Sequence, residues 1–260
     1  MTVVRGPVGA LYVDDGGSEA SGAPPVLFLH SLAGTAAQWQ AQLAHLRRHR
    51  RAAALELRGH GRSETPASGD YAIPSLAGDV AAATVALGLR RFVLVGHSFG
   101  ATVALEYAAG HAEHVAGLLL VDPNGDQRRL PAEELAAFTA ALASPAYQAT
   151  VRAHWRRITA GGNPTARRAV LRDLDATPRV TFIESFKALS VYDPLPALAR
   201  YRGPKLSLIT ALNETPIGLH RLVPDLPYRF VPGTGHWIHM DRPEEFNRIM
   251  DAFLAAVPRS

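Results

Sequence analysis

Short runs of apolar residues alternate along the chain with longer segments in which apolar residues recur every three or four positions. The short runs are predicted strands, and the middle ones are apolar without interruption, which is typical of strands buried on both faces. The longer segments are predicted helices. This alternation indicates an α/β fold, in which a mostly parallel central sheet is flanked by helices. The predicted strands are Leu11–Val13, Val26–Leu29, Ala52–Leu57, Phe92–Val95, Leu118–Val121, Leu206–Ile209 and Tyr228–Val231, and the predicted helices are Ala36–Arg47, Ile73–Leu87, Ala101–Ala109 and Pro243–Val257.

The alternation is interrupted between residues 123 and 192. This segment contains helical patterns but no convincing strand, and it is far longer than the usual connection between two elements of a compact domain. We therefore predict a core domain formed by residues 1–122 and 193–260, with residues 123–192 inserted as a helical lid over the carboxyl edge of the sheet. The helical patterns of the predicted lid are Ala132–Leu142, Tyr147–Thr159, Thr165–Leu174 and Phe182–Leu189.

A serine lies between two glycines where a predicted strand meets a predicted helix, in the sequence Gly96-His97-Ser98-Phe99-Gly100. The pattern Gly-x-Ser-x-Gly also arises by chance, but a strand before it and a helix after it are the context of a nucleophile elbow. The glycines leave room for a sharp turn, because a Cβ at either position would crowd the backbone. The free N–H groups at the start of the helix favour negative charge beside the serine. Ser98 is therefore the predicted nucleophile.

A serine hydroxyl is a weak nucleophile and needs a base to take its proton. The loop after the last predicted strand offers two histidines, His236 and His239. We expect His236 to be the base, because the glycines at 233 and 235 make a tight loop that carries it back over the sheet edge. His239 lies closer to the final helix. His97 adjoins Ser98, so its side chain leaves the turn in another direction.

Attack by a serine also needs two N–H donors for the negative oxygen that forms. One predicted donor is the backbone of Phe99, the residue after the nucleophile. The other is expected in the small, turn-prone sequence HSLAG at residues 30–34, which follows an early predicted strand. We predict that the backbone N–H groups of Leu32 and Phe99 form the oxyanion hole.

Four motifs occur in order along the chain: FLHSLAGTAAQW after an early strand, LRGHGRS at residues 57–63, GHSFG around Ser98, and GTGHWIHMDRPEEF near the end. With these motifs the sequence resembles the α/β-hydrolase superfamily over nearly its whole length. The resemblance implies an α/β-hydrolase fold with a helical lid, Ser98 as nucleophile, His236 as base, and an acid between them in chain order. Ser31 stands where family members usually have glycine, as in sequences that resemble enol-lactonases.

The acid of the expected triad is harder to place. In the family it usually follows the strand that here is Leu206–Ile209, in a pattern similar to Ile-Thr-Gly-x-x-Asp. This chain has ITALNETP, so Ala211 replaces the glycine and Glu214 stands where the aspartate is expected. Some family members use instead the end of the strand that here is Leu118–Val121, where Asp122 follows. We predict Glu214 as the acid, because glutamate accepts an imidazole N–H as aspartate does, and keep Asp122 as the alternative.

The serine at position 98 separates this chain from relatives with an aspartate nucleophile, such as epoxide hydrolases and haloalkane dehalogenases. We predict a serine hydrolase that cleaves a carboxylic ester or a lactone through an acyl-enzyme. Two other reactions fit the same triad, namely hydrolysis of a C–C bond and peracid formation by a cofactor-free perhydrolase or haloperoxidase. A non-catalytic ligand-binding protein of the same fold is a further alternative. The aromatic residues that we expect to contact the substrate are Trp39, Phe138, Trp155 and Trp237.

Composition mainly excludes other kinds of protein. The chain has no cysteine, which excludes disulfides, thiolate metal ligands and a cysteine nucleophile. The formal charge is +4, but the one dense basic run, HLRRHRR at residues 45–51, has no interleaved aromatic residues and is expected to be a solvated helix end. We expect a small ester or lactone as partner, and no cofactor, metal, nucleic acid or membrane. Without a secretory signal or a membrane-spanning apolar run, the expected location is cytoplasmic.

Overall fold

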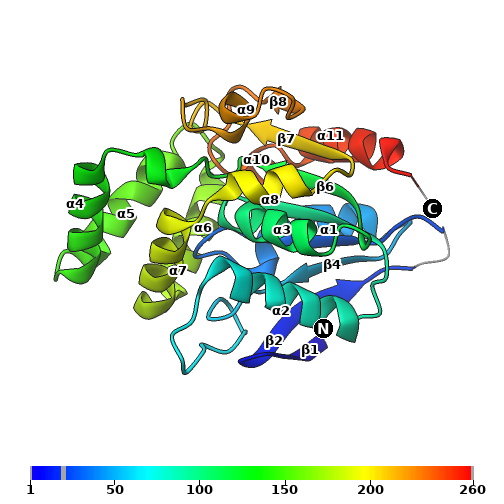
Figure 1. Ribbon diagram of the computed structural model, residues 1–260, viewed down its shortest axis with the longest axis horizontal. Helices are drawn as coiled ribbons and strands as arrows, with labels where there is room; N and C mark the ends of the chain where they lie inside the picture. Colours follow the sequence, from blue (N-terminus) through cyan, green and yellow to red (C-terminus); the bar gives the residue numbers. More distant parts are fainter. Residues whose placement is uncertain (1, 19–21, 259–260) are drawn as a thin grey trace.

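An eight-stranded sheet runs through the centre of the computed structural model, which describes residues 2–18 and 22–258 (Figure 1). The strand order is β1-β2-β4-β3-β5-β6-β7-β8. β2 is antiparallel to both β1 and β4, and all pairs from β4 onward are parallel. The predicted α/β fold with a mostly parallel sheet is therefore confirmed. The strands are β1 (Thr2–Gly6), β2 (Gly9–Gly16), β3 (Val26–Leu29), β4 (Ala52–Leu55), β5 (Phe92–His97), β6 (Val115–Val121), β7 (Lys205–Ile209) and β8 (Tyr228–Phe230).

The edge strand β1 has no counterpart among the predicted strands. It is five residues long, only Val4 is buried, and it pairs with β2 across a short turn at Pro7 and Val8. A short edge strand with one buried residue gives almost no apolar signal in the sequence. The strands that carry the expected active-site residues lie in the middle of the sheet and are buried throughout.

Helices cover both faces of the sheet, and successive residues of the buried strands face opposite layers. In β3, Leu27 and Leu29 belong to one apolar cluster, whereas Val26 and Phe28 belong to the other. The first cluster includes residues of α2, α3 and α8, and the second includes residues of η1, α1, α10 and α11. The bounds are η1 (Ala36–Trp39), α1 (Gln40–Leu46), α2 (Ile73–Ala86), α3 (Phe99–Gly110), α8 (Pro194–Arg200), α9 (Leu219–Leu222, between β7 and β8), α10 (Ile238–Asp241) and α11 (Pro243–Ala256).

Between β6 and α8 the described chain forms helices and no strand, and these helices lie together at one end of the sheet, on the left of Figure 1. Their buried residues, such as Val151, Val170 and Phe182, join the first apolar cluster. Phe138 and Trp155 line the same pocket as Ser98, so this group of helices covers the carboxyl end of β5. Its elements are η2 (Gln127–Arg129), α4 (Ala132–Ala143), α5 (Tyr147–Ile158), α6 (Pro164–Ala176) and α7 (Arg179–Val191).

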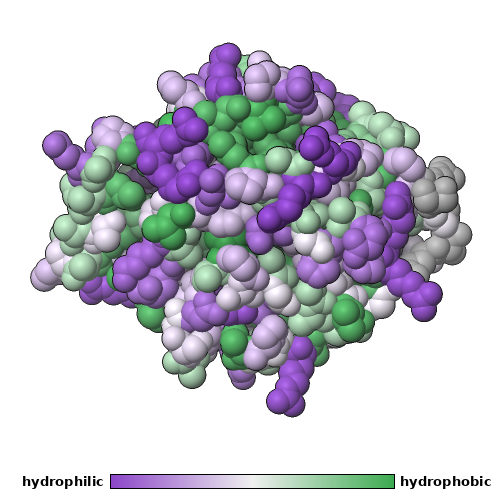
Figure 2. Space-filling view, viewed as in Figure 1, coloured by the Kyte–Doolittle hydropathy of each residue, from purple (hydrophilic) through white to green (hydrophobic). Residues whose placement is uncertain are grey.

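The surface is mainly polar on the face shown in Figure 2, with a larger apolar area at the top, over the part of the molecule where α9 and β8 lie. β8 is the edge strand on that side, and Tyr228 and Phe230 are both exposed there. Among the described residues, no helix is both long and apolar enough to cross a membrane.

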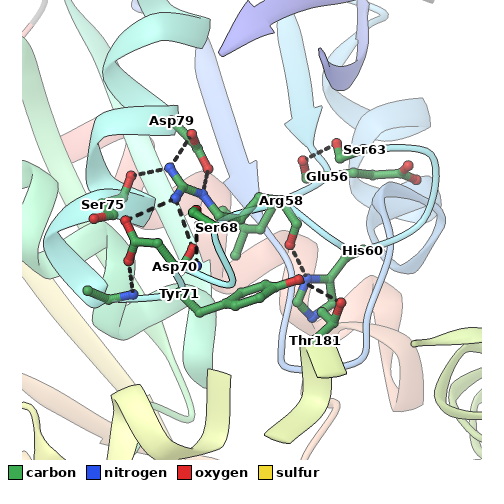
Figure 3. A network of polar contacts seen from close by, with 12 residues as sticks. Glu56, Arg58, His60, Ser63, Ser68, Asp70, Tyr71, Ser75, Asp79 and Thr181 are labelled. Carbon is green, nitrogen blue, oxygen red and sulfur yellow. Dashed lines mark hydrogen bonds and ion pairs between the residues drawn. The ribbon is translucent and has the colours of Figure 1, made fainter. Parts of the chain in front are cut away.

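A buried ion pair anchors the loop that carries the LRGHGRS motif (Figure 3). The Arg58 guanidinium donates hydrogen bonds to both carboxylate oxygens of Asp79 in α2, at 2.5 and 2.7 Å. Its remaining N–H groups reach the carbonyl oxygens of Asp70 and Ser75. Both side chains of the pair are at most 1% exposed, and burial raises the pKa of Asp79, opposed by Arg58. The Arg58 contacts therefore attach the loop of the LRGHGRS motif to α2.

Asp79→Ala is expected to lower the free energy of unfolding by about 3–5 kcal/mol, because it leaves the buried Arg58 charge without its partner. Urea unfolding followed by circular dichroism measures this loss. Asp175→Ala is the matched control, since Asp175 pairs with Arg152 on the surface and such pairs contribute about 0–1 kcal/mol. Equal stability of the two variants would show that the Arg58–Asp79 pair contributes no more than a surface pair.

Candidate active site

Ser98 lies on a strained turn between β5 and α3, where the sequence predicts it. Its backbone has φ of 53° and ψ of −114°, a conformation that costs about 1–3 kcal/mol for a residue other than glycine. A Cβ on Gly96 would lie 2.4 Å from the carbonyl oxygen of Gly100, and a Cβ on Gly100 would lie 2.4 Å from that of His30. Both glycines are therefore required by backbone contacts, and the turn holds Ser98 at the first turn of α3.

The imidazole of His236 is held by a buried carboxylate. Its Nδ1 donates a hydrogen bond to Oδ2 of Asp122 at 2.5 Å, and the aspartate side chain is 0% exposed. Because the carboxylate accepts at Nδ1, the other nitrogen, Nε2, is left as the acceptor of the neutral ring. Ser98 and His236 line the same pocket. The arrangement thus places an imidazole with a fixed tautomer in the pocket that the strained serine also lines.

Asp122 is itself fixed by the end of the neighbouring strand. Thr210, the residue after β7, donates its backbone N–H to Oδ1 at 2.7 Å and its hydroxyl to Oδ2 at 2.9 Å. Asn213 Nδ2 donates to the backbone carbonyl oxygen of Asp122 at 3.1 Å. Asp122 follows β6 and has a positive φ of 42°. Donors from the loop after β7 therefore hold Asp122 in one orientation toward the imidazole.

Glu214 does not take the position that we predicted for it. Its carboxylate accepts hydrogen bonds from Arg221, with Nε at 2.8 Å, and from His220, and the Arg221 guanidinium lowers the pKa of Glu214. After Thr210 the backbone turns, with the N–H of Glu214 bonded to the carbonyl oxygen of Thr210, and the side chain faces α9. The alternative, Asp122, contacts His236 instead. Thr210 is one residue that sequence analysis missed, and its position directly after a buried strand is the signal that could have revealed it.

His97 supports the loop that carries His236. Its Nε2 donates to the backbone carbonyl oxygen of His236 at 2.9 Å, and the two rings lie 4.6 Å apart between centroids. Burial, with smaller contributions from His236 and His239, holds the pKa of His97 well below its usual value, so the ring is neutral. The His97 side chain thus bonds to the backbone of the loop that carries His236.

The residues predicted for the oxyanion hole, Leu32 and Phe99, both line the pocket beside Ser98. Phe99 is the first residue of α3, where backbone N–H groups have no partner within the helix. A third polar group was not predicted: Asn124 Nδ2 donates to the Ser98 hydroxyl oxygen at 3.3 Å. Asn124 follows Asp122 by two residues, so one short loop supplies both the carboxylate and this amide.

Gln38 connects the two loops that flank the serine. Its Oε1 accepts a hydrogen bond from the Trp237 indole N–H at 3.2 Å and one from the Ser31 hydroxyl at 3.4 Å. Its Nε2 donates to Asp173 Oδ2 in α6 at 3.0 Å, and burial raises the pKa of that carboxyl. Trp237 follows His236 in the chain, and Ser31 precedes Leu32. The buried Gln38 amide therefore fixes the residues next to the His236 imidazole and next to the Leu32 N–H group.

Gln38→Met is expected to lower kcat about tenfold with little change in KM, because small displacements of catalytic groups slow the reaction without removing substrate contacts. Steady-state kinetics on an activated ester measures both constants. Gln40→Met, at an exposed position two residues along the chain, is the control and should leave kcat unchanged. A rise in KM at unchanged kcat would contradict a positioning role for Gln38.

The pocket above Ser98 has a volume of about 430 Å³. Three of the four aromatic residues that we expected to contact the substrate line it: Phe138, Trp155 and Trp237. Trp39 does not, because η1 turns it toward the opposite layer, where it is 0% exposed and stacks on His239 with centroids 3.9 Å apart. Among the described residues, the polar groups of the lining that sequence analysis did not single out are Asn124, Gln127, Glu134, His154, Arg157, Asn213 and Thr215.

Residues 24–243, most of the chain, match the family model described as the alpha/beta hydrolase fold. The chain belongs to this family. Two curated relatives align with most of this α/β hydrolase. An sn-1-specific diacylglycerol lipase of Mus musculus is 28% identical over 255 residues, covering 89% of this chain and 81% of the relative. A putative carbamate hydrolase RutD of Shigella flexneri serotype 5b (strain 8401) is 28% identical over 250 residues, covering 90% and 92%.

Among solved structures, the enol-lactonase of Burkholderia xenovorans LB400 is similar to this α/β hydrolase, with a TM-score of 0.82. The two chains are 21% identical, and the match covers 98% of this chain and 100% of the other. At this identity the likeness concerns the fold. The family and the names of the curated relatives support a hydrolase.

Proposed function

We propose that this α/β hydrolase cleaves a carboxylic ester or a lactone through an acyl-enzyme formed on Ser98. The observation that carries the proposal is the hydrogen bond from His236 Nδ1 to the buried carboxylate of Asp122, in the pocket that Ser98 also lines. A base whose tautomer is fixed by a buried acid is the arrangement that activates a serine hydroxyl. In the proposed triad the acid is Asp122.

The first half-reaction acylates the serine. His236 Nε2 takes the hydroxyl proton as Ser98 Oγ attacks the acyl carbon, and the carbonyl oxygen becomes negative. The backbone N–H groups of Leu32 and Phe99 are the proposed donors to that oxygen, and the N-terminus of α3 adds a favourable dipole. When the intermediate collapses, the bond to the leaving oxygen breaks and His236 gives its proton to that oxygen. An alcohol leaves; with a lactone, the hydroxyl stays on the acyl group.

The second half-reaction reverses these roles with water. His236 takes a proton from water, whose oxygen attacks the acyl carbon, and then returns the proton to Ser98 Oγ as the acid is released. Asp122 stays ionised and stabilises the imidazolium that forms in both steps.

The walls of the pocket support a compact, partly apolar substrate. Phe138, Trp155 and Phe182 come from the helices inserted between β6 and α8, so these helices form the wall opposite the serine. A volume of about 430 Å³ lies within the range of small-molecule sites. We propose that this insertion acts as the lid expected from the sequence and that its inner face selects the acyl or alcohol group.

Hydrolysis of 4-nitrophenyl butyrate tests the proposal. We expect a burst of nitrophenol followed by steady turnover, and an intact-mass increase equal to one butyryl group in a sample quenched with acid during turnover. Peptide mapping should locate this group on Ser98. Turnover without an acylated Ser98 would contradict the acyl-enzyme mechanism, and failure to hydrolyse any ester or lactone would favour a binding protein of this fold.

A further inference from the structure

His154 and Arg157 lie one helical turn apart on α5 and both line the pocket that contains Ser98. Residues three apart on a helix share one face, so both side chains project from the same wall. Arg157 Nη2 lies 3.2 Å from His154 Nδ1. The His154 ring also contacts the rings of Phe138 and Trp155, with centroids 5.5 and 5.6 Å away, which fixes it within an aromatic wall.

The contact between these two residues determines where the histidine proton lies. A guanidinium group has no acceptor, so Nδ1 of His154 must accept the hydrogen bond from Arg157. Burial, together with the charges of Arg157 and His236, lowers the pKa of His154 to about 4. The ring is therefore neutral at pH 7 and carries its proton on Nε2. The pair presents only donors: the Nε2–H of His154 and the remaining N–H groups of Arg157.

Arg157 has no acidic partner among the described residues. No carboxylate in the described part of the chain lies within ion-pair distance of it, whereas Arg152 on the same helix pairs with Asp175. Arg157 is also the one arginine or lysine in the described lining of the pocket. The lining contains one acidic residue, Glu134 on α4, which is exposed and likewise has no ion-pair partner within that part of the chain. A single positive charge oriented by a neutral histidine thus stands on the α5 wall.

We propose that His154 and Arg157 form an anion subsite and that the preferred substrates are esters or lactones carrying a carboxylate away from the scissile bond. A carboxylate matches the pair, because it has one negative charge and accepts hydrogen bonds from two donors. A phosphate monoester carries more negative charge than one guanidinium balances. This inference rests on the proposed function, since it assigns the substrate class of the same pocket.

Three 4-nitrophenyl esters of equal chain length test the subsite: the hexanoate, the mono-ester of adipic acid and the 6-aminohexanoate. They end in a methyl group, a carboxylate and an ammonium group respectively. We expect kcat/KM for the adipate, divided by that for the hexanoate, to fall about tenfold in Arg157→Gln, as expected for loss of one charge-assisted hydrogen bond. The same ratio in the unaltered protein should fall as salt is raised, because the guanidinium is exposed.

Arg156→Gln is the matched control, because Arg156 is also exposed on α5 but does not line the pocket. Its ratio should equal that of the unaltered protein. An equal fall of the adipate-to-hexanoate ratio in Arg157→Gln and Arg156→Gln would contradict the subsite. It would indicate that the ratio depends on the total positive charge of α5. A preference for the 6-aminohexanoate that disappears in Glu134→Gln would also overturn it, by assigning charge selection to the acidic residue.

Binding of the products separates this inference from the proposed function. Calorimetry should show adipate binding about tenfold more weakly to Arg157→Gln than to the unaltered protein, while Arg156→Gln binds it normally. This comparison of adipate affinities requires no turnover, so it tests the subsite even if the protein hydrolyses no ester. Equal affinity of the unaltered protein and Arg157→Gln for adipate would refute the subsite. If the protein nevertheless hydrolysed esters, the proposed function would still hold.

Discussion

Ser98→Ala is expected to abolish ester hydrolysis, lowering kcat by about ten-thousand-fold or more, while the protein remains folded. The hydroxyl oxygen is the one protein atom in the proposed mechanism that forms a bond to the acyl carbon. Alanine keeps the Cβ and removes just that oxygen, which accepts a hydrogen bond from Asn124 at 3.3 Å. The measurement is turnover of 4-nitrophenyl butyrate beside a thermal unfolding curve.

The control for this loss is Ser190→Ala. Ser190 lies on α7 and donates its hydroxyl to the carbonyl oxygen of Lys187, away from the pocket lining. We expect normal turnover in this variant. Hydrolysis by Ser98→Ala at the rate of the Ser190 variant would exclude Ser98 as the nucleophile, provided that the unfolding curves coincide.

Asp122→Asn is expected to lower kcat about a thousandfold to ten-thousandfold with little change in KM. The carboxylate accepts from His236 Nδ1 and stabilises the positive charge that develops on the ring. An asparagine has no negative charge, and its NH₂ group favours the wrong tautomer when it faces the imidazole. Steady-state kinetics with Asp122→Asn and with Glu214→Gln compares the two residues that the sequence offered as the acid.

Glu214→Gln should leave kcat within about twofold of the unaltered protein, since the Glu214 carboxylate bonds to Arg221, and His236 bonds to Asp122 instead. Its carboxylate bonds to Arg221 and His220 beside α9. The opposite order of effects, with the Glu214 variant much slower than the Asp122 variant, would contradict the assignment of the acid. It would require a loop rearrangement that carries residue 214 to the imidazole.

The parts of the fold that the sequence predicted are those whose signal is local. The buried strands are uninterrupted apolar runs, and the elbow around Ser98 is defined by two glycines that backbone contacts require. The loop carrying His236 follows from its glycines and from its place after the last strand. Each of these inferences needs only neighbouring residues, which explains why sequence reasoning reached them.

The choice of the acid depends instead on contacts between distant segments. Asp122 and Glu214 each follow a central strand, and which of them meets His236 depends on how the loop after β7 turns. Thr210 decides this, because its N–H and hydroxyl bind the Asp122 carboxylate while the chain beyond it directs Glu214 outward. No pattern of apolar positions encodes that pair of hydrogen bonds.

The lining of the pocket was predicted only in part for the same reason. Aromatic residues on the inserted helices were expected to face inward, and Phe138 and Trp155 do. Trp39 lies on η1, and its side chain packs against His239 of α10 and Phe246 of α11, so its large ring fills the opposite layer. The contact between His154 and Arg157 became visible only once α5 was placed against the serine.

The most direct test of the account is covalent labelling of the serine by a fluorophosphonate at neutral pH, since this measures activation of the hydroxyl without any assumption about the substrate. The account predicts rapid labelling of the unaltered protein at Ser98, located by peptide mass spectrometry, and labelling about a thousandfold or more slower in a folded His236→Gln variant. Labelling of both proteins at the same rate, or no labelling of Ser98 in the unaltered protein, would contradict a hydroxyl activated by His236.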